Sequence, residues 1–202
     1  MVGSKKDYFL VSIIGFFFAL FLLPILKNVQ VPFWTFSAVN VTALILFFVI
    51  FSNIALRVAD YFGRKTFLVW QFSKFGAVGS LGAALDFGIL NILIFLTGTA
   101  TGIHFSFFKG ISFILANTNG FFWNKYWTFS FNGALNIKEY GKYFLVGVIG
   151  FGINVGIASL VVNAMGPIGE IGPAMWANVG AVIAGVFSMV WNFWGYKFIV
   201  FK

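Results

Sequence analysis

The feature that most constrains this chain is a succession of long apolar segments, each close to the length that crosses a lipid bilayer. A helix needs roughly 20 apolar residues to span the hydrocarbon core. Segments that meet this requirement alternate with short polar stretches along the whole chain. We expect membrane-spanning helices at residues 8–26, 33–56, 75–96, 105–123, 143–165 and 174–196.

Composition supports lipid as the solvent and helices as the spanning elements. Hydrophobic residues make up 60% of the 202 residues and charged residues only 9%, whereas a soluble domain carries about 25% charged residues. In lipid, every backbone polar group must be paired within the protein, so only helices and closed barrels can span it. Barrel strands alternate apolar and polar residues, and the apolar segments here are nearly continuous. The predicted fold class is an all-α, polytopic membrane protein with six transmembrane helices.

The positive charges indicate how these helices are oriented. Cytoplasmic loops of membrane proteins carry an excess of lysine and arginine. With a cytoplasmic N-terminus, 11 of the 13 basic residues fall on the cytoplasmic side, and only Lys27 and Lys109 fall toward the outer side. We therefore expect a multi-pass protein of the cytoplasmic membrane, with both termini cytoplasmic. We interpret the net charge of +8 as a topology signal that also attracts anionic membrane lipids, not as a nucleic-acid surface.

The chain contains an internal repeat. Residues 74–88 align without gaps to residues 142–156, at an offset of 68 positions (142 − 74), and share lysine, valine and glycine positions. Each copy continues into a second span that ends in a basic and aromatic segment. Both copies begin and end on the same side of the membrane, so they are parallel repeats.

The repeat predicts three parts along the chain. Residues 1–57 form two leading transmembrane helices, and residues 58–73 form a cytoplasmic interfacial segment with its aromatic side chains at headgroup level. Residues 74–202 form a four-helix domain made of two parallel two-helix repeats, 74–131 and 142–202. Small residues at four-residue spacing indicate close packing of helices, and we expect a homo-oligomer.

Two charged residues inside the predicted spans are candidates for function. Asp86 is the only acid within a span, and an ionisable group at that depth costs about 2.5–3.5 kcal/mol. It could line a polar or proton-linked path, or it could be a protonated group hydrogen-bonded to a neighbouring helix. Lys109 lies near the outer end of the fourth span. It could contact a phosphate, or it could extend to the outer headgroups.

Lysines recur at matching span ends of the two repeats. A lipid phosphate needs cations at the depth of the headgroups. The alternative role of such lysines is to set topology and to bind bulk anionic lipid, each contributing about 1 kcal/mol. The candidate phosphate contacts are Lys74, Lys109, Lys125, Lys142 and Lys197.

Amide and indole side chains accompany these charges. Amides both donate and accept hydrogen bonds, which suits sugar hydroxyls, and indole rings pack against the C–H faces of sugars. The alternative role of the amides is hydrogen bonding between helices. The candidate sugar or polar-path residues are Asp86, Asn117, Asn119, Asn124, Asn154, Asn178, Asn192, Trp123 and Trp191.

Motifs for catalysis are missing from the sequence. The chain has no cysteine, which excludes disulfides and thiol chemistry, and its single histidine, His104, has no second ligand at metal-binding spacing. It has no phosphate-binding loop of the nucleotide-hydrolase type and no assembled Ser–His–Asp set. We therefore expect no enzyme activity, no metal and no cofactor.

The duplicated segments resemble the GtrA-like family of small membrane proteins, over about residues 71–202. Lysine stands where the family usually has arginine at Lys125 and Lys197, and Tyr196 replaces an asparagine. The two leading spans are additional to the family's four-span core. The residues that carry the resemblance are 74–79, 119–129, 142–147, 191–193 and 197–201.

The resemblance implies participation in cell-envelope glycosylation. Family members are linked to moving polyprenyl-phosphate-linked sugars from the cytoplasmic to the outer leaflet, where a separate membrane glycosyltransferase uses the sugar for polysaccharide or glycoconjugate synthesis. Two other functions stay open, namely a scaffold that anchors such a glycosyltransferase and a small-solute or ion transporter. Charges within the spans argue against a scaffold, and the lack of a mid-span proline argues against a solute transporter.

Overall fold

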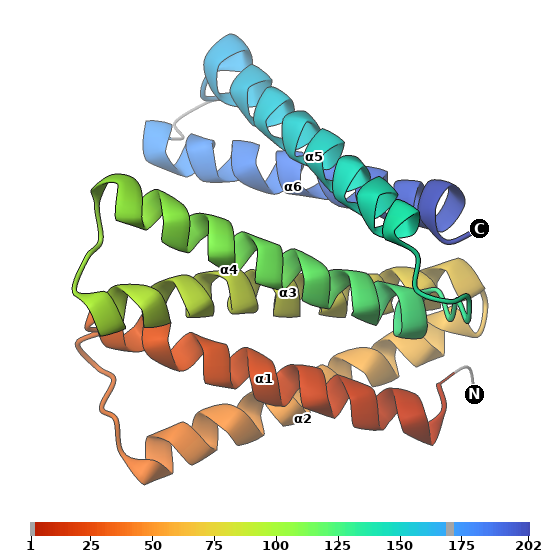
Figure 1. The fold of residues 1–202 in the computed structure, drawn as a ribbon, viewed down its shortest axis with the longest axis horizontal. Coiled ribbons are helices and arrows are strands. Elements are labelled where there is room, and N and C mark those ends of the chain that lie inside the picture. The colour runs from red at the N-terminus through yellow and green to blue at the C-terminus, as the bar shows by residue number, and fades with distance from the viewer. Residues whose placement is uncertain (1–2, 169–171) are drawn as a thin grey trace. The chain divides into compact units, whose positions relative to one another are not determined.

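A computed structural model describes residues 3–168 and 172–202, and this part of the chain contains helices and no strand (Figure 1). These helices confirm the all-α fold class. The six α-helices are α1 (Lys5–Val29), α2 (Ala38–Gly63), α3 (Phe67–Thr97), α4 (Gly102–Trp123), α5 (Ile137–Ser159) and α6 (Pro173–Gly195). Three short π-helices follow α4, α5 and α6, namely η1 (Asn124–Thr128), η2 (Leu160–Met165) and η3 (Tyr196–Val200).

Five helical segments of the described chain are long and apolar enough to cross a membrane, so the protein is a multi-pass membrane protein. The remaining helix, α4, is less apolar because it includes Lys109, Asn117 and Asn119. Its 22 residues extend over about 33 Å, and its role as a sixth span stays a prediction. The five segments are Lys5–Val29, Ala38–Gly63, Phe67–Thr97, Ile137–Met165 and Met175–Val200.

The ends of the helices follow from local sequence. The Ser4 hydroxyl accepts a hydrogen bond from the Asp7 backbone N–H, and the Asp7 carboxylate accepts one from the Ser4 backbone N–H. This reciprocal capping box fixes the start of α1. Ser37 caps α2 through its side chain, so α2 begins later than the predicted start at residue 33. Gly98, with a φ of 67°, ends α3 in the left-handed conformation that glycine adopts without a Cβ clash.

The segment predicted to lie separately at the cytoplasmic interface, residues 58–73, is divided between two long helices. Its first part completes α2, and its last part begins α3 at Phe67. The Cβ and backbone of Trp70 pack against Gly63, where an added Cβ would lie 2.9 Å from the Cβ of Trp70. This close contact brings the end of α2 against the first turn of α3. The placement of these residues at a membrane surface stays a prediction.

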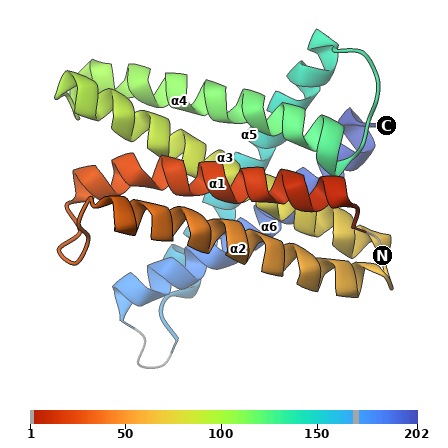
Figure 2. The same cartoon turned by 90° about the horizontal axis from the view of Figure 1, so that it is seen from below.

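The helices form two compact units, unit 1 (Met1–Ser130) and unit 2 (Phe131–Lys202). In unit 1, α1 packs against α2 and α3, and α3 also contacts α4 and η1 (Figures 1 and 2). In unit 2, α5 packs against α6 and η3. The buried core of unit 1 consists of Val11, Ile14, Leu56, Ala59, Trp70, Val78, Leu81 and Trp127.

Two glycines set the close approach of α1 to its neighbours. A Cβ at Gly15 of α1 would lie 2.5 Å from the backbone oxygen of Phe48 on α2. A Cβ at Gly88 of α3 would lie 2.7 Å from the backbone oxygen of Phe21 on α1. In lipid, van der Waals contact replaces hydrophobic burial as the main attraction between helices, so this close contact stabilises unit 1.

Candidate functional site

Charged side chains of unit 1 gather at two levels along α3. Lys74 and Asp86 lie 12 residues apart on this helix (86 − 74), which corresponds to about 18 Å along its axis. Lys74 pairs with Asp7 of α1, and Asp86 pairs with Lys109 of α4. We name these groups the Asp7 cluster and the Asp86 cluster.

The Asp7 cluster joins α1, α3 and η1. Lys74 Nζ donates to Asp7 Oδ1 over 2.9 Å, and Trp127 Nε1 donates to the same oxygen over 2.9 Å. The other carboxylate oxygen, Oδ2, accepts from the backbone N–H and the hydroxyl of Ser4, at 2.9 and 2.6 Å. The lysine ammonium also lies 5.0 Å from the ring centroid of Trp127. Asp7 and Lys74 are buried. The four donors to the carboxylate, together with the ion pair and the Trp127 ring beside the ammonium, offset the loss of water.

Two cavities adjoin the Asp7 cluster and share Lys6, Tyr126 and Trp127. The first, which we name the polar cavity, has a volume of about 260 Å³ and is also lined by Lys74 and Thr128. The second, which we name the aromatic cavity, has a volume of about 280 Å³, and its other lining residues are Leu10, Phe122 and Trp123. Because they share lining residues, the two cavities are neighbours at the end of unit 1 where α1 begins.

The two repeats end in the same backbone feature. The π-helices η1 and η3 occupy equivalent positions of the repeats, 72 residues apart (196 − 124). Each closes with a hydrogen bond across five residues, from Phe129 N to Asn124 O and from Phe201 N to Tyr196 O, both of 2.9 Å. A π-turn contains one residue more than an α-turn, and such turns are frequent at functional sites. This match supports the predicted repeat.

Lys125 lies within η1 and is completely buried. Its ammonium lies 5.8 Å from the ring centroids of Phe121 and Tyr126. The equivalent lysine of η3, Lys197, is half-buried and also lies over aromatic rings. A lipid phosphate could reach Lys125 only if the end of unit 1 opened, so a role in phosphate binding stays a prediction for both lysines.

Equivalent residues of the two repeats have different surroundings in the two units. Lys74 is buried in the Asp7 cluster, whereas the equivalent lysine of the second repeat, Lys142, is exposed. Tyr196, which stands where the first repeat has Asn124, stacks on Tyr143 with a centroid separation of 4.0 Å. An aromatic pair therefore occupies the part of unit 2 that corresponds to a polar position in unit 1.

The Asp86 cluster joins α3 and α4. Lys109 Nζ donates to Asp86 Oδ2 over 2.5 Å, and the Ser112 hydroxyl donates to Oδ1 over 2.6 Å. Ser112 is completely buried, while the Asp86 and Lys109 side chains are 18% and 40% exposed. Lys109 of α4 thus reaches across to Asp86 of α3, and its contact with outer headgroups stays a prediction. Asp86 has a cation as its partner, an arrangement that neither sequence-based interpretation included.

The predicted amide and indole residues of unit 1 lie on α4 and η1. Asn117 and Asn119 are half-buried, and Oδ1 of the first and Nδ2 of the second have no hydrogen-bond partner among the described residues. Asn124 is buried. Trp123 lines the aromatic cavity and meets Trp127 edge to face, with ring centroids 5.7 Å apart. Of this set, only Trp123 lies at one of the cavities described above.

The predicted residues of unit 2 do not gather at one described cavity. Trp191 Nε1 donates to the backbone oxygen of Val146 over 3.1 Å, which fixes α6 against α5. Asn192 packs so closely on α5 that a Cβ at Gly150 would collide with its side chain. Asn154 is half-buried and Asn178 is exposed. Their place in a polar path stays a prediction.

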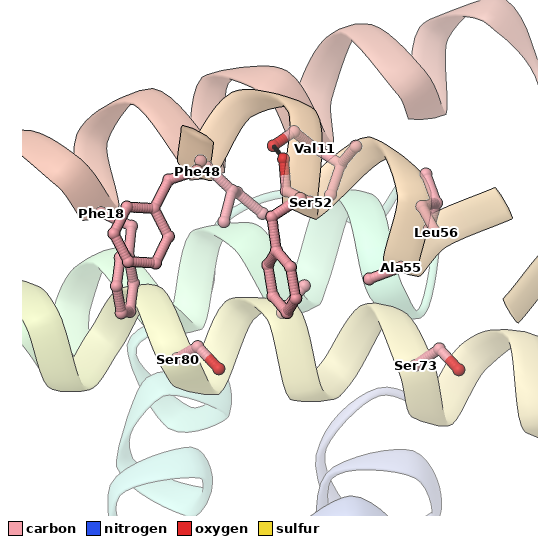
Figure 3. A pocket seen from close by; sticks show the side chains of 12 residues that line it. Val11, Phe18, Phe48, Ser52, Ala55, Leu56, Ser73 and Ser80 are labelled. Carbon is pink, nitrogen blue, oxygen red and sulfur yellow. Dashed lines mark hydrogen bonds between the residues drawn. The ribbon is translucent and has the colours of Figure 1, made fainter. Parts of the chain in front are cut away.

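A third cavity, of about 340 Å³, lies between α1, α2 and α3 (Figure 3). Phe18 and Phe48 lie together at one end of it, and Ser73 and Ser80 line it from α3. The Ser52 hydroxyl is already bonded to the backbone oxygen of Val11, at 3.1 Å. None of the described residues that line this cavity is charged, so it suits a hydrocarbon chain and not a phosphate or sugar.

Of the residues that line the polar cavity, only Lys74 was predicted from the sequence as a site residue. Those that were missed and that matter for its chemistry are Lys6, Asp7, Tyr126, Trp127, Thr128 and Ser130. The predicted first span began at residue 8, just after the two charged residues. The available signal was the pattern Ser4-x-x-Asp7 before an apolar run, which is typical of a helix start. It would have placed Asp7 inside the first helix, although not beside Lys74.

Comparison with known proteins assigns the family. Residues 74–201 match the family described as GtrA/DPMS, transmembrane domain. This range contains α4, α5, α6 and most of α3, whereas α1 and α2 lie outside it. No curated protein and no solved structure matches the chain. Because the match covers more than half of the 202 residues, the chain belongs to the GtrA/DPMS transmembrane domain family.

Proposed function

We propose that this protein moves a polyprenyl-phosphate-linked sugar from the cytoplasmic to the outer leaflet of a prokaryotic cytoplasmic membrane. A separate membrane glycosyltransferase then uses the sugar for cell-envelope polysaccharide or glycoconjugate synthesis. Membership of the GtrA/DPMS family supports this setting, because the family is associated with polyprenyl-linked sugars. The structural observation that carries the proposal is the presence of two charged clusters at different levels of α3.

The two clusters offer polar partners within a region that is otherwise apolar. They lie about 18 Å apart along α3, in a membrane whose hydrocarbon core is about 30 Å thick. A phosphate that leaves water loses its hydration and needs charge-assisted hydrogen bonds instead. Lys74 and Lys109 can provide such bonds, and the internal carboxylates hold both lysines in place while no phosphate is bound. The isoprenoid chain stays in the lipid.

A non-transporting scaffold for the glycosyltransferase would make different use of the same residues. In a scaffold, the Asp86–Lys109 pair would only fasten α3 to α4. In a transporter, the pair must open so that Lys109 can meet the phosphate. The two functions therefore differ in whether Lys109 matters beyond stability.

Reconstitution in sealed lipid vesicles tests the proposal. A short-chain isoprenyl-phosphate-glucose is added to the outer leaflet, and a membrane-impermeant sugar-oxidising reagent measures how much remains accessible. In protein-containing vesicles, part of the probe should become inaccessible to the reagent at a higher rate than in empty vesicles. Lys109→Gln should abolish this effect, whereas Lys138→Gln, a change of an exposed lysine at the start of α5, should leave it unchanged. Equal rates with and without protein would refute transport, and copurification of a glycosyltransferase would then favour the scaffold.

A further inference from the structure

One buried hydroxyl in the polar cavity has no hydrogen-bond partner. Thr128 of η1 is 2% exposed, and its Oγ1 makes no hydrogen bond to any residue that the structure describes. A buried hydroxyl without a partner costs about 1–3 kcal/mol, and such groups are rare enough to require an explanation. Because Thr128 lines the polar cavity, a ligand in that cavity would supply the missing partner.

The cations around this hydroxyl indicate an anionic ligand. Lys6 and Lys74 both line the polar cavity, and Asp7 is the only carboxylate among its described lining residues, which together carry a net charge of +1. Lys6 is exposed and forms no ion pair with a described residue. The Asp7 carboxylate does not compete for the ligand, because four donors from Ser4, Lys74 and Trp127 already occupy its two oxygens.

Ser130 adds a second hydroxyl to the polar cavity in an unusual backbone conformation. Its φ of 51° lies in the left-handed region, where residues other than glycine are uncommon. Strain of this kind persists where the surrounding structure fixes it, and it gathers at binding sites. The hydroxyls of Thr128 and Ser130 therefore line the same cavity as the free lysine Lys6.

The adjoining aromatic cavity provides a surface for a different part of the ligand. Trp123, Tyr126 and Trp127 line it, and Lys6 lies between the two cavities because it lines both. The flat faces of such rings suit the C–H face of a sugar, as aromatic residues combine a large apolar surface with a polar edge. Each cavity is smaller than the range of about 300–1,000 Å³ that small-molecule sites occupy, and the two together fall within it.

We propose that the polar and aromatic cavities form one binding site for a sugar-phosphate headgroup, completed by the leading helix α1. Lys6 and Thr128 hold the phosphate in the polar cavity, and Trp123 and Tyr126 receive the sugar in the aromatic cavity. The inference rests on the proposed function for the nature of the ligand. It adds that Lys6, outside the family-matched residues 74–201, contributes a phosphate contact.

Direct binding tests this site without requiring transport. The full-length protein is placed in nanodiscs of phosphatidylcholine and titrated with radiolabelled short-chain isoprenyl-phosphate-glucose, or with the same isoprenyl phosphate lacking glucose. Lys6→Gln should weaken the binding of both probes about tenfold, because a hydrogen bond to a charged group is lost. Lys5→Gln is the matched control, since Lys5 is also exposed but lines neither cavity, and it should bind both probes as the wild type does.

Two further changes separate the phosphate from the sugar. Thr128→Val should lower the affinity for both probes about threefold or more. Thr128→Ser keeps the hydroxyl and should bind both probes as the wild type does. Trp123→Leu should lower the affinity only for the probe that carries glucose. Thermal unfolding of each variant identifies any that fail to fold, and the Thr128→Ser comparison remains informative if the valine variant is unstable.

The outcomes distinguish this site from the proposed transport. Wild-type affinity in both Lys6→Gln and Thr128→Val would overturn the site, even if the protein transports the probe. Binding that depends on these residues in a protein that does not transport would leave the site standing and refute the proposed function. Displacement of the probe by equimolar phosphatidylglycerol, with no gain in affinity from glucose, would identify a general anionic-lipid contact and overturn the sugar-phosphate assignment.

Discussion

Trp127 donates a hydrogen bond to Asp7 over 2.9 Å, although the two residues are 120 positions apart in the sequence. The bond connects the leading helix α1 to the π-helix η1 that ends the first repeat. The same carboxylate oxygen accepts from Lys74. A helix outside the family-matched residues therefore supplies the counter-charge for a buried lysine inside them.

This relationship explains why the two repeats treat equivalent lysines differently. Lys74 can be buried because α1 brings a carboxylate to it, whereas Lys142 is exposed. A buried lysine without a partner would carry a large desolvation cost, so burial in the first repeat depends on the leading helix. The leading helix thus changes the electrostatics of the repeat it packs against.

The first prediction concerns the stability of the Asp7 cluster. Asp7→Asn leaves the Lys74 ammonium buried without an anion, and it should lower the free energy of unfolding by about 3 kcal/mol. Denaturant unfolding in detergent, followed by tryptophan fluorescence, measures this change. The double variant Asp7→Asn with Lys74→Met removes both charges and should recover part of the loss. Additive losses from the two substitutions would mean that the pair is not coupled.

The second prediction concerns the contact of α1 with α2. Gly15→Ala introduces a Cβ that would lie 2.5 Å from a backbone oxygen and 2.6 Å from the Ser52 hydroxyl. The helices must move apart, so we expect the free energy of unfolding to fall by about 1–3 kcal/mol. Gly79→Ala on α3 is the control, because a Cβ there meets nothing within 4 Å. Equal effects of the two substitutions would show that helix propensity, not contact, determines the result.

The helices could be predicted from the sequence because the bilayer imposes their length and leaves few alternatives. The pattern of glycines, lysines and aromatics also identified the family, since those features are local and recur along the sequence. The extension of the second and third helices through residues 58–73 was missed because charges there interrupt the apolar pattern. The close contact of Trp70 with Gly63 beside that turn is not visible in the pattern either.

The candidate site was less accessible to prediction because it depends on which helices are neighbours. Asp86 and Lys109 were both identified, but counting residues places them at different depths and does not predict that they pair. Lys6 was counted only among the basic residues at segment ends and Asp7 was not singled out, since nothing in the sequence places α1 beside η1. Duplication was a poor guide to the site, because Tyr143 and Tyr196 form an aromatic stack in the second repeat.

The third prediction concerns membrane orientation. The chain has no native cysteine, so a single introduced cysteine reports unambiguously on its own position. Asn132→Cys, in the segment between η1 and α5, should react with a membrane-impermeant maleimide only after the cells are opened. Ala100→Cys, between α3 and α4, should react in intact cells. Both positions are exposed, and the reverse labelling pattern would mean that the distribution of lysine and arginine does not set the topology.

The fourth prediction separates the structural from the transport role of the Asp86–Lys109 pair. Asp86→Lys combined with Lys109→Asp restores an ion pair between α3 and α4 but places the cation on α3. Each single substitution leaves an unpaired or repelling charge in a partly buried position, so each should lower the unfolding temperature, and the exchanged pair should recover most of the loss.

Transport should respond differently to the same exchange. If a phosphate meets the cation of this pair during crossing, moving that cation from α4 to α3 changes where the phosphate can be held. The exchanged protein should then fold and insert normally while the protection of isoprenyl-phosphate-glucose in vesicles stays close to the level of empty vesicles. Recovery of both stability and transport would assign the pair to the fastening of α3 against α4 alone, and the phosphate would have to cross by way of other residues.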